Sequence, residues 1–393
     1  MLDIEKPRTA LREESLPAWI LCNLFHRDEV ADLVLDIPAH TTNTRPWVCL
    51  IFRDRPPVKI VHRIEASILD HVPGETLLYA TRDEYTSALS RVLPSSGDVA
   101  ADFSLVIPVG SFLDHGTALL LARSGCRLVP AENLVARCLG TLDDSARRSH
   151  AAAASVLFAA VREAWALVVE RSRGDAGNRR PLREGELRNL ITSRISRAGL
   201  VTDGLPIVGA GANSSNPHYT VQGDGAPISP GDVVQLDMWA KEDAPGAVYA
   251  DISWIGVAAR EPTPAQASAF EAVVRAREAA VETLVRGLAQ GRGVRGDEVD
   301  AAARSTLVSL GYGEYLRHRT GHSIGSRVHG FGVNLDSIEF PDTRVIPEGA
   351  CFSIEPGVYM PEFGMRTEID CWIHGGRLVV TGDERQRALL VLE

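Results

Sequence analysis

Short apolar runs alternate with amphipathic segments over the first third of the chain. Apolar runs bounded by turn residues predict strands, and the longer mixed segments between them have helical periodicity. This βαβ-like alternation predicts an α/β domain with a central sheet over residues 1–142. Its expected strands are 47–52, 58–64, 76–80, 103–109 and 126–131, and its expected helices are 84–93 and 115–125.

The pattern changes near residue 143, where long helical segments alternate with strands. The helix expected from residue 263 has the clearest start, because Thr263 can cap it, Pro264 suits its first position and Gln266 completes a capping box. The pattern predicts an α+β domain over residues 143–393. Its expected helices are 143–174, 182–199, 263–287 and 296–311; its expected strands are 231–240, 247–257, 349–359, 365–375 and 377–383; a polar loop is expected over 173–181.

Two of these strands have the same sequence pattern. SPGDVVQLD and IPEGACFSIE each combine a Pro/Gly turn, an apolar strand and an acid, and Asp237 follows Gly231 at the spacing at which Glu355 follows Gly349. Turns before strands are common, so two unrelated turns are the alternative. The match favours a duplicated half-domain whose acids converge at its centre.

Charge and cysteine usage limit the partners and the compartment. A formal net charge of −10 over 393 residues disfavours nucleic acids and anionic membranes, because both bind basic surfaces. The segment through Trp19 lacks the apolar core of a leader. No apolar run is expected to reach the length of a membrane span, because Arg162 and Glu163 interrupt the Ala-rich stretch after Ala151. The six cysteines form no CxxC pair. These features predict a cytoplasmic two-domain protein with free thiols.

Four carboxylates interrupt the apolar strands of the second domain: Asp237, Asp251, Glu355 and Glu368. Acids are depleted in strands and costly to bury, so four in one domain suggest shared cations. Two divalent ions and one imidazole would balance their charge. Such a set suits manganese, with cobalt, iron or zinc as alternatives. Two neighbouring ions can convert a shared water to hydroxide.

The run HRTGHSIGSRVHG contains His318, His322 and His329. His318 and His322 have the spacing of a zinc-binding helix, but that motif requires Glu where this chain has Arg319, and Gly321 disfavours a helix. From the residues alone, each histidine could bind a metal, contact a substrate or pack by hydrogen bonding.

The order of five residues resembles the pita-bread metallopeptidases, the family of methionine aminopeptidase, Xaa-Pro aminopeptidase and prolidase. The motifs GHSIG, IEPG and RTE and the step from His322 to His329 also match. The first domain resembles the creatinase-like domain of longer members in size, position and α/β character. The resemblance implies a pita-bread fold with pseudo-two-fold internal duplication. The five residues are Asp237, Asp251, His322, Glu355 and Glu368.

The resemblance also implies roles. The five residues would bind two divalent ions, and a hydroxide between the ions would attack an amide carbonyl. Glu355 would carry a proton to the leaving nitrogen, while His218 and His329 would stabilise the oxyanion and position the substrate. His318 would form a structural or substrate-contacting wall. Arg366 would hold Asp251 or a product carboxylate.

The chain departs from the family pattern in two places. The hairpin between Asp237 and Asp251 carries extra residues, which a turn tolerates. Trp254 follows Asp251 closely and is expected to alter the surroundings of the metals or a pocket wall. Arg344 is the one arginine that suggests itself for reading a proline carboxylate, so dipeptidase and aminopeptidase both stay open.

The expected function is therefore metal-dependent cleavage of the peptide bond before proline in a small peptide, without nucleic-acid or membrane partners. Long members of the family form dimers, so a homodimer is expected. Two alternatives stay open. One is a metal-dependent, creatinase-like hydrolase of a non-peptide C–N bond in a specialised small molecule, and the other is a non-catalytic pita-bread binding protein.

Overall fold

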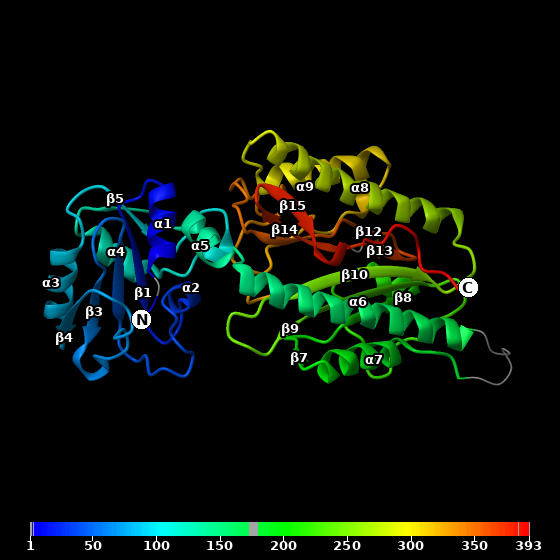
Figure 1. The fold of residues 1–393 in the computed structure, drawn as a ribbon, viewed down its shortest axis with the longest axis horizontal. Coiled ribbons are helices and arrows are strands. Elements are labelled where there is room, and N and C mark those ends of the chain that lie inside the picture. Colours follow the sequence, from blue (N-terminus) through cyan, green and yellow to red (C-terminus); the bar gives the residue numbers. More distant parts are fainter. Residues whose placement is uncertain (1, 3, 173–179, 384, 393) are drawn as a thin grey trace. The chain divides into compact units, whose positions relative to one another are not determined.

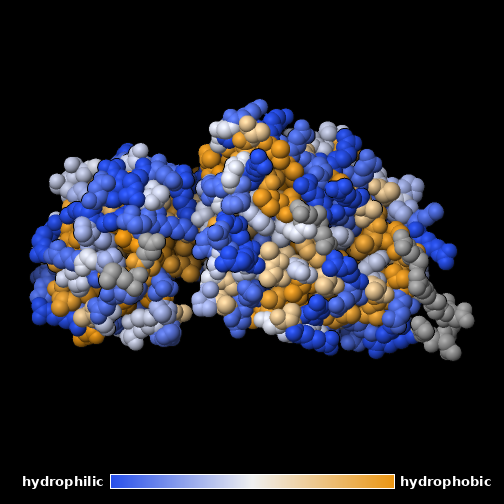
Figure 2. Space-filling model, in the orientation of Figure 1, coloured by the Kyte–Doolittle hydropathy of each residue, from blue (hydrophilic) through white to orange (hydrophobic). Residues whose placement is uncertain are grey.

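The computed structural model describes residues 2, 4–172, 180–383 and 385–392. The chain divides into two compact units, Met1–Leu139 and Gly140–Glu393, drawn in Figure 1. The polar loop expected over 173–181 lies largely outside the described residues. Figure 2 shows hydrophilic side chains along the outer margins of both units, with apolar residues interspersed.

The first unit contains a mixed six-stranded sheet in the order β4-β3-β2-β1-β5-β6. β2 is buried along its whole length, as the run WVCLIF predicts. The α/β character expected for this part is confirmed. The strands are β1 (Ala18–Asn23), β2 (Trp47–Phe52), β3 (Val58–His62), β4 (Glu75–Tyr79), β5 (Asp98–Ala101) and β6 (Arg127–Pro130); the helices are α1 (Glu5–Glu13), α2 (Glu29–Val34), α3 (Arg82–Val92), α4 (His115–Ala122) and α5 (Glu132–Leu139).

The strand predicted over residues 103–109 is wrong. The Ser104 hydroxyl accepts hydrogen bonds from the backbone N–H groups of Val106 and Ile107, at 3.1 and 2.7 Å, and draws this segment into a turn. Pro108 then begins a 3₁₀ helix. The strand that pairs with β1 and β6 is instead the shorter β5.

The second unit contains two strand groups, each with its own helix pair. β9 pairs with β7, β8 and β10, whereas β14 pairs with β11 and β15, and β12 pairs with β13. The strands are β7 (Leu200–Val201), β8 (Ile207–Ala210), β9 (Val233–Glu242), β10 (Ala250–Val257), β11 (Cys351–Ile354), β12 (Gly357–Tyr359), β13 (Gly364–Arg366), β14 (Ile369–His374) and β15 (Arg377–Val380); the helices are α6 (Asp144–Ser172), α7 (Glu184–Arg197), α8 (Pro264–Ala289) and α9 (Gly296–Ser309).

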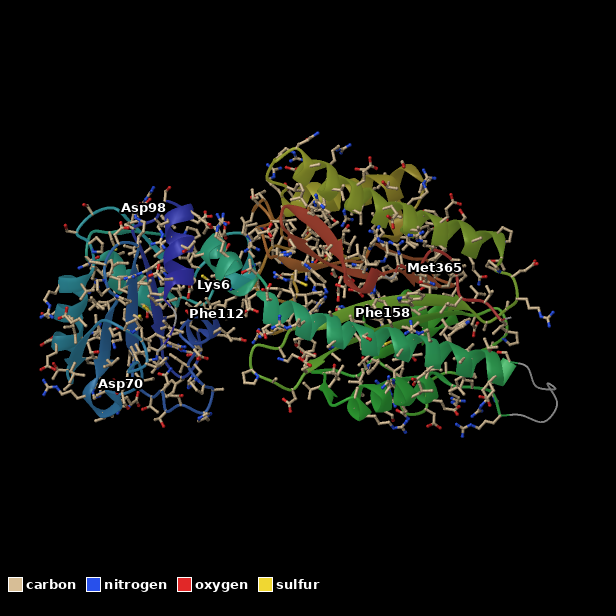
Figure 3. All side chains as sticks on the ribbon, in the orientation of Figure 1. Lys6, Asp70, Asp98, Phe112, Phe158 and Met365 are labelled. Atoms are coloured by element: carbon tan, nitrogen blue, oxygen red, sulfur yellow. The ribbon has the colours of Figure 1, made fainter. Side chains whose placement is uncertain are left out.

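The helix pairs cover different strands. α6 packs on α7, β9 and β10, while α8 packs on α9 and on strands of the second group. Figure 3 labels Phe158 on α6 and Met365 on β13, which are buried members of the two halves. Gly231 and Gly349, which begin the two repeated turn–strand segments, both have positive φ, at 89° and 82°. The fold confirms the duplicated architecture that the resemblance implies.

α6 differs from the expectation that no segment is long enough to cross a membrane. By length and composition alone, α6 could cross a membrane. However, half of its most apolar 18-residue stretch is buried inside the second unit. Ala160, Ala164 and Val168 are all buried against the core. The burial is that of a core helix, and Arg162 and Glu163 lie among its exposed positions.

Candidate metal centre

The β9–β10 hairpin supplies two acids to one face of its sheet. Asp237 lies opposite Ser253 in the antiparallel ladder, and Asp251 lies opposite Trp239. Alternate residues of a strand share a face, so these four side chains project to the same side. Asp237 and Asp251 are only 6% and 5% exposed.

The paired strands β11 and β14 bring two further acids to the same place. Ile354 pairs with Ile369 at the end of the β11–β14 ladder, so Glu355 and Glu368 leave that ladder together. The Glu368 N–H donates to the Ser253 carbonyl at 3.1 Å, and the Ser253 hydroxyl donates to Glu368 Oε2 at 2.8 Å. These bonds join the β9–β10 hairpin to the β11–β14 pair at the centre of the unit.

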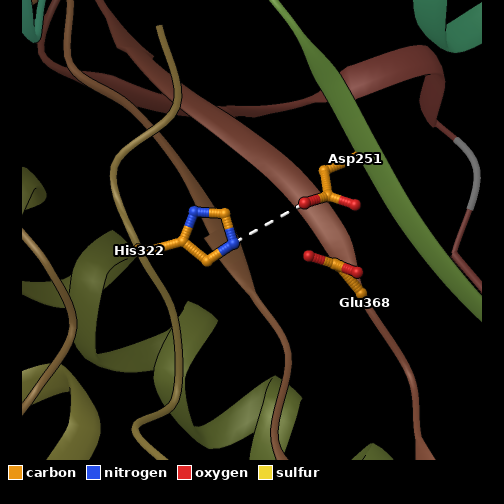
Figure 4. A group of neighbouring side chains, drawn as sticks. All are labelled: Asp251, His322 and Glu368. Carbon is orange, nitrogen blue, oxygen red and sulfur yellow. Dashed lines mark ion pairs between the residues drawn. The ribbon is translucent and has the colours of Figure 1, made fainter. Parts of the chain in front are cut away.

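His322 reaches the acids from a segment that runs beside β11. The Ser353 N–H donates to the His322 carbonyl at 2.9 Å. A Cβ at Gly321 would lie 2.1 Å from the Ser353 carbonyl oxygen, so this close approach requires glycine. His322 Nε2 consequently lies 3.6 Å from Asp251 Oδ2 (Figure 4). The same atom lies 3.3 Å from Glu355 Oε1.

The described ligand atoms of Asp251, His322 and Glu368 lie within 4.8 Å of one another. Asp237 and Glu355 face the same cavity, which has a volume of about 320 Å³. The structure therefore brings together all five residues on which the resemblance depends. The other residues lining the cavity are Ile207, Pro217, His218, Trp239, His318, Arg319, Val328, His329, Glu339 and Arg366.

Two carboxylate oxygens in this cavity lack hydrogen-bond partners among the described residues, and both belong to residues that could bind a cation. Asp251 Oδ1 and Glu368 Oε1 are buried and have no hydrogen-bond partner in the described part of the chain. Burial first, and neighbouring carboxylates second, raise the pKa of both groups well above the usual range. Burial lowers the pKa of His322 to about 3, which leaves its imidazole neutral. Buried polar atoms need partners, so this set of donor atoms fits divalent metal ions.

Arg366 holds a different acid from the one expected. Its Nη2 pairs with Asp237 rather than Asp251, and its Nε donates to the Ser253 hydroxyl at 3.1 Å. The backbone explains the choice, because the Arg366 N–H donates to Gln235 Oε1 at 2.9 Å and Gln235 Nε2 donates back to the Arg366 carbonyl at 3.1 Å. β13 is thereby fixed beside the part of β9 that carries Asp237.

The three other predicted histidines all line the cavity. His318 contacts the Arg319 carbonyl through Nδ1 at 2.6 Å and the Tyr359 hydroxyl through Nε2 at 2.7 Å. The ring of His329 lies edge-on to that of His322, with 4.3 Å between centroids. His218 and His329 are exposed, so both are open to a ligand entering the cavity.

Two expectations are corrected here. Trp254 follows Ser253 by one residue, so it projects from the opposite face of β10 and contacts Phe158 in a separate apolar cavity. It therefore does not line the metal cavity. Arg344 is 7% exposed and is occupied by Asp342 Oδ1 at 2.8 Å, so it does not face the cavity and cannot read a substrate carboxylate there.

Three residues in or behind the cavity wall were not predicted from the sequence: Trp239, Ser253 and Tyr359. Trp239 lines the cavity, and its indole N–H donates to Asp203 Oδ1 at 2.6 Å. Ser253 holds Glu368, and Tyr359 receives a bond from Arg366 Nη1 at 3.1 Å. Strand alternation could have found Trp239 and Ser253, because each lies two residues from a predicted acid.

The fold and the site define a duplicated α+β domain whose buried carboxylates and histidine form a site that could hold metal ions. A model of "Metallopeptidase family M24" matches residues 143–374, and the chain belongs to this family. It is 38% identical over 168 residues to an Xaa-Pro dipeptidase of Lactobacillus helveticus, covering 42% of this chain and 41% of that protein. It is 36% identical over 200 residues to an Xaa-Pro dipeptidase of Lactobacillus delbrueckii subsp. lactis, covering 49% and 50%. The chain thus spans about half, or less, of the length of the curated relatives it matches.

Solved structures share the whole fold at lower identity. A dipeptidase PepE structure from Mycobacterium ulcerans aligns with a TM-score of 0.72 at 23% identity, covering 99% of this chain and 96% of that one. An Xaa-Pro dipeptidase structure from Bacillus anthracis aligns with a TM-score of 0.67 at 22% identity, covering 99% of both chains. At this identity the likeness establishes the fold, including the first unit.

Proposed function

We propose that this protein is a metal-dependent hydrolase that cleaves the peptide bond before proline, as an Xaa-Pro dipeptidase or aminopeptidase. The observation that carries the proposal is the pair of buried carboxylate oxygens, on Asp251 and Glu368, that lack a partner within the described chain beside the neutral imidazole of His322. Membership of family M24 supports metallopeptidase chemistry. The names of the Lactobacillus relatives favour the dipeptidase over the aminopeptidase.

Two divalent ions, manganese first, are the proposed cofactors. Asp237, Asp251, His322, Glu355 and Glu368 would hold them. When bound, the ions supply Lewis acidity that lowers the pKa of water and polarises the amide carbonyl.

The remaining chemistry belongs to side chains around the cavity. Glu355 lies beside His322 and accepts a bond from the Ser353 hydroxyl at 3.1 Å, which leaves it placed to carry a proton from water to the leaving nitrogen. His218 and His329 would donate to the carbonyl oxygen as it gains negative charge. His318, held by Tyr359, would form the wall between them.

The proposal extends to the whole protein. The first domain, residues 1–142, would be the creatinase-like domain, and residues 143–393 would be the catalytic domain. All six cysteines are free, which supports a reducing, cytoplasmic location. The assembly would be a homodimer with a small peptide as substrate and neither nucleic acid nor membrane as partner.

The test is an assay of chelator-treated protein before and after addition of manganese. Substrates are an Xaa-Pro dipeptide, the same dipeptide extended by one residue, and the matching Xaa-Ala dipeptide. We expect metal-dependent hydrolysis of the Xaa-Pro dipeptide alone, while cleavage of the extended peptide would identify an aminopeptidase. A metal-loaded protein that cleaves none of them would support the creatinase-like alternative, and a protein that binds no metal would support the binding-protein alternative.

A further inference from the structure

The segment between β8 and β9 brings His218 to the cavity, yet regular structure covers little of it. After β8 it contains only the short 3₁₀ helix η3 (Gly211–Ser215), and residues 216–226 form turns and loops. Pro217 and His218 line the cavity. A loop residue can act on a substrate only if other contacts fix the loop.

Glu184, the first residue of α7, provides those contacts. Its side chain is fully buried, and its carboxylate accepts four hydrogen bonds from the last residue of β8 and from the segment that follows it. Oε1 accepts from the Ala210 N–H and from Asn213 Nδ2, both at 2.9 Å. Oε2 accepts from the Tyr219 hydroxyl at 2.9 Å and from the Ala226 N–H at 2.7 Å.

These four donors flank His218 on both sides. Asn213 Nδ2 also donates to the Tyr219 hydroxyl at 3.0 Å, which closes a ring of contacts around the loop. Burial, followed by the bond to Glu184, raises the pKa of Tyr219 to about 12, so the phenol remains a donor. A Cβ at Gly225 would lie 2.8 Å from Glu184 Oε2, so the loop closes tightly over the carboxylate.

We propose that Glu184 is a positioning residue for catalysis, because its carboxylate ties together both ends of the loop that presents His218 to the substrate. Glu184 does not line the cavity, so it acts through His218 rather than on the substrate. The proposal rests on the function proposed above and adds to it the residue that orients one of its two oxyanion donors.

The test is a double-mutant cycle of Glu184→Gln with His218→Ala on the manganese-loaded, full-length protein, using an Xaa-Pro dipeptide. Glutamine keeps the shape of the side chain but turns one acceptor into a donor facing other donors. We expect Glu184→Gln to lower kcat about tenfold with KM changed less than twofold, as for loss of an interaction made in the transition state. In the His218→Ala background the same change should lower kcat less than twofold, because the residue it positions is already gone.

Two further variants keep the result interpretable. Tyr219→Phe removes one donor and leaves Glu184 in place; we expect a drop in kcat of two- to threefold (about 0.5 kcal/mol), again suppressed by His218→Ala. Glu186→Gln is the matched control, because Glu186 lies on the same helix and pairs with Arg171 and Arg180 instead of the loop. It should leave kcat unchanged. Tyr219→Phe carries the test if Glu184→Gln does not fold.

The failures are distinguishable. Losses in kcat that multiply in the double variant, or a His218→Ala variant with unchanged kcat, would overturn the positioning role while leaving an active Xaa-Pro peptidase. A wild-type protein that hydrolyses no Xaa-Pro substrate would overturn the proposed function. In that case backbone hydrogen exchange still tests whether Glu184 holds the loop. Glu184→Gln should speed exchange over residues 210–226, and Glu186→Gln should not.

Discussion

Asp251 and Glu368, from different strand pairs, bring carboxylate oxygens within 4.8 Å of one another in the cavity, and each keeps a buried oxygen without a hydrogen-bond partner in the described structure. A buried, unpaired carboxylate is costly, and a bound cation removes that cost. The metal-free protein therefore carries a destabilising feature at its centre, and the first prediction follows from it.

Manganese should stabilise the wild-type protein and fail to stabilise Glu368→Gln. At a metal concentration about 100 times Kd, binding to the folded state alone adds about 2.7 kcal/mol to the free energy of unfolding. Thermal unfolding with and without manganese measures the difference. Without metal, Glu368→Gln should be at least as stable as wild type, because the amide is uncharged, whereas the Glu368 side chain must either bury a charge or take up a proton. A metal-induced shift of the same size in both proteins would contradict this prediction.

Ser253→Ala should weaken metal binding without unfolding the protein. The hydroxyl donates to Glu368 and accepts from Arg366, so its loss frees two groups that orient the acids. Contacts that orient metal ligands are typically worth about 10- to 100-fold in affinity. Titration with manganese measures the change. Ser90→Ala is the control, because the Ser90 hydroxyl donates to the Thr86 carbonyl of its own helix, in the first unit. Equal affinity in Ser253→Ala and wild type would refute the role.

Gly321→Ala should disrupt the approach of the His322 segment to β11. The new methyl group would meet the Ser353 carbonyl at 2.1 Å, and backbone cannot move aside as a flexible side chain can. Overpacking of this kind costs about 1–3 kcal/mol. Urea unfolding tests the stability, and Gly313→Ala is the control, because its nearest neighbour, Val308 Cγ2, is at an ordinary 3.4 Å. Equal urea midpoints for the two variants would be inconsistent with the close packing.

The buried His150 should make the protein less stable in mild acid. Burial lowers the pKa of His150 from 6.5 to about 4, and its ring nitrogens contact the Tyr249 carbonyl and the Thr381 hydroxyl. Below pH 6.5, His150 takes up a proton in the unfolded state but stays neutral in the folded state. The free energy of unfolding therefore falls as the pH drops from about 6.5 to 4. The loss amounts to about 3 kcal/mol.

The measurement is the urea midpoint of wild type and His150→Gln across that pH range, at a fixed concentration of chelator. The difference in urea midpoint between the two proteins should shrink as the pH falls, because glutamine at position 150 does not titrate and only the wild type loses stability through this group. A constant difference would show that His150 does not titrate on unfolding.

Sequence patterns locate the acids of the site because acids in apolar strands are conspicuous. Burying an acid in an apolar strand is costly, which singles out four residues: Asp237, Asp251, Glu355 and Glu368. The helices were predictable for a similar reason: Thr263 caps α8 as its sequence indicates, accepting from the Gln266 N–H at 3.3 Å. Local chemistry determined these features.

Features that depend on strand parity or long-range pairing were less accessible. Counting in twos from Asp251 places Ser253 on the site face and Trp254 on the other, so alternation alone corrects the Trp254 expectation. The partner of Arg366 was out of reach, because it depends on contact with Gln235, which is 131 residues away. The partner of Arg344 was easier to predict, because Asp342 is only two residues before it in the sequence.

The most direct test of the account is the number of manganese ions bound per chain. Chelator-stripped wild type and the double variant Asp251→Asn/Glu368→Gln are equilibrated with manganese, and bound metal is counted by elemental analysis, with circular dichroism confirming that both are folded. We expect two ions per wild-type chain and loss of at least one from the double variant. A folded wild type that binds no manganese, cobalt, iron or zinc, or a double variant that binds as many ions as wild type, would contradict it.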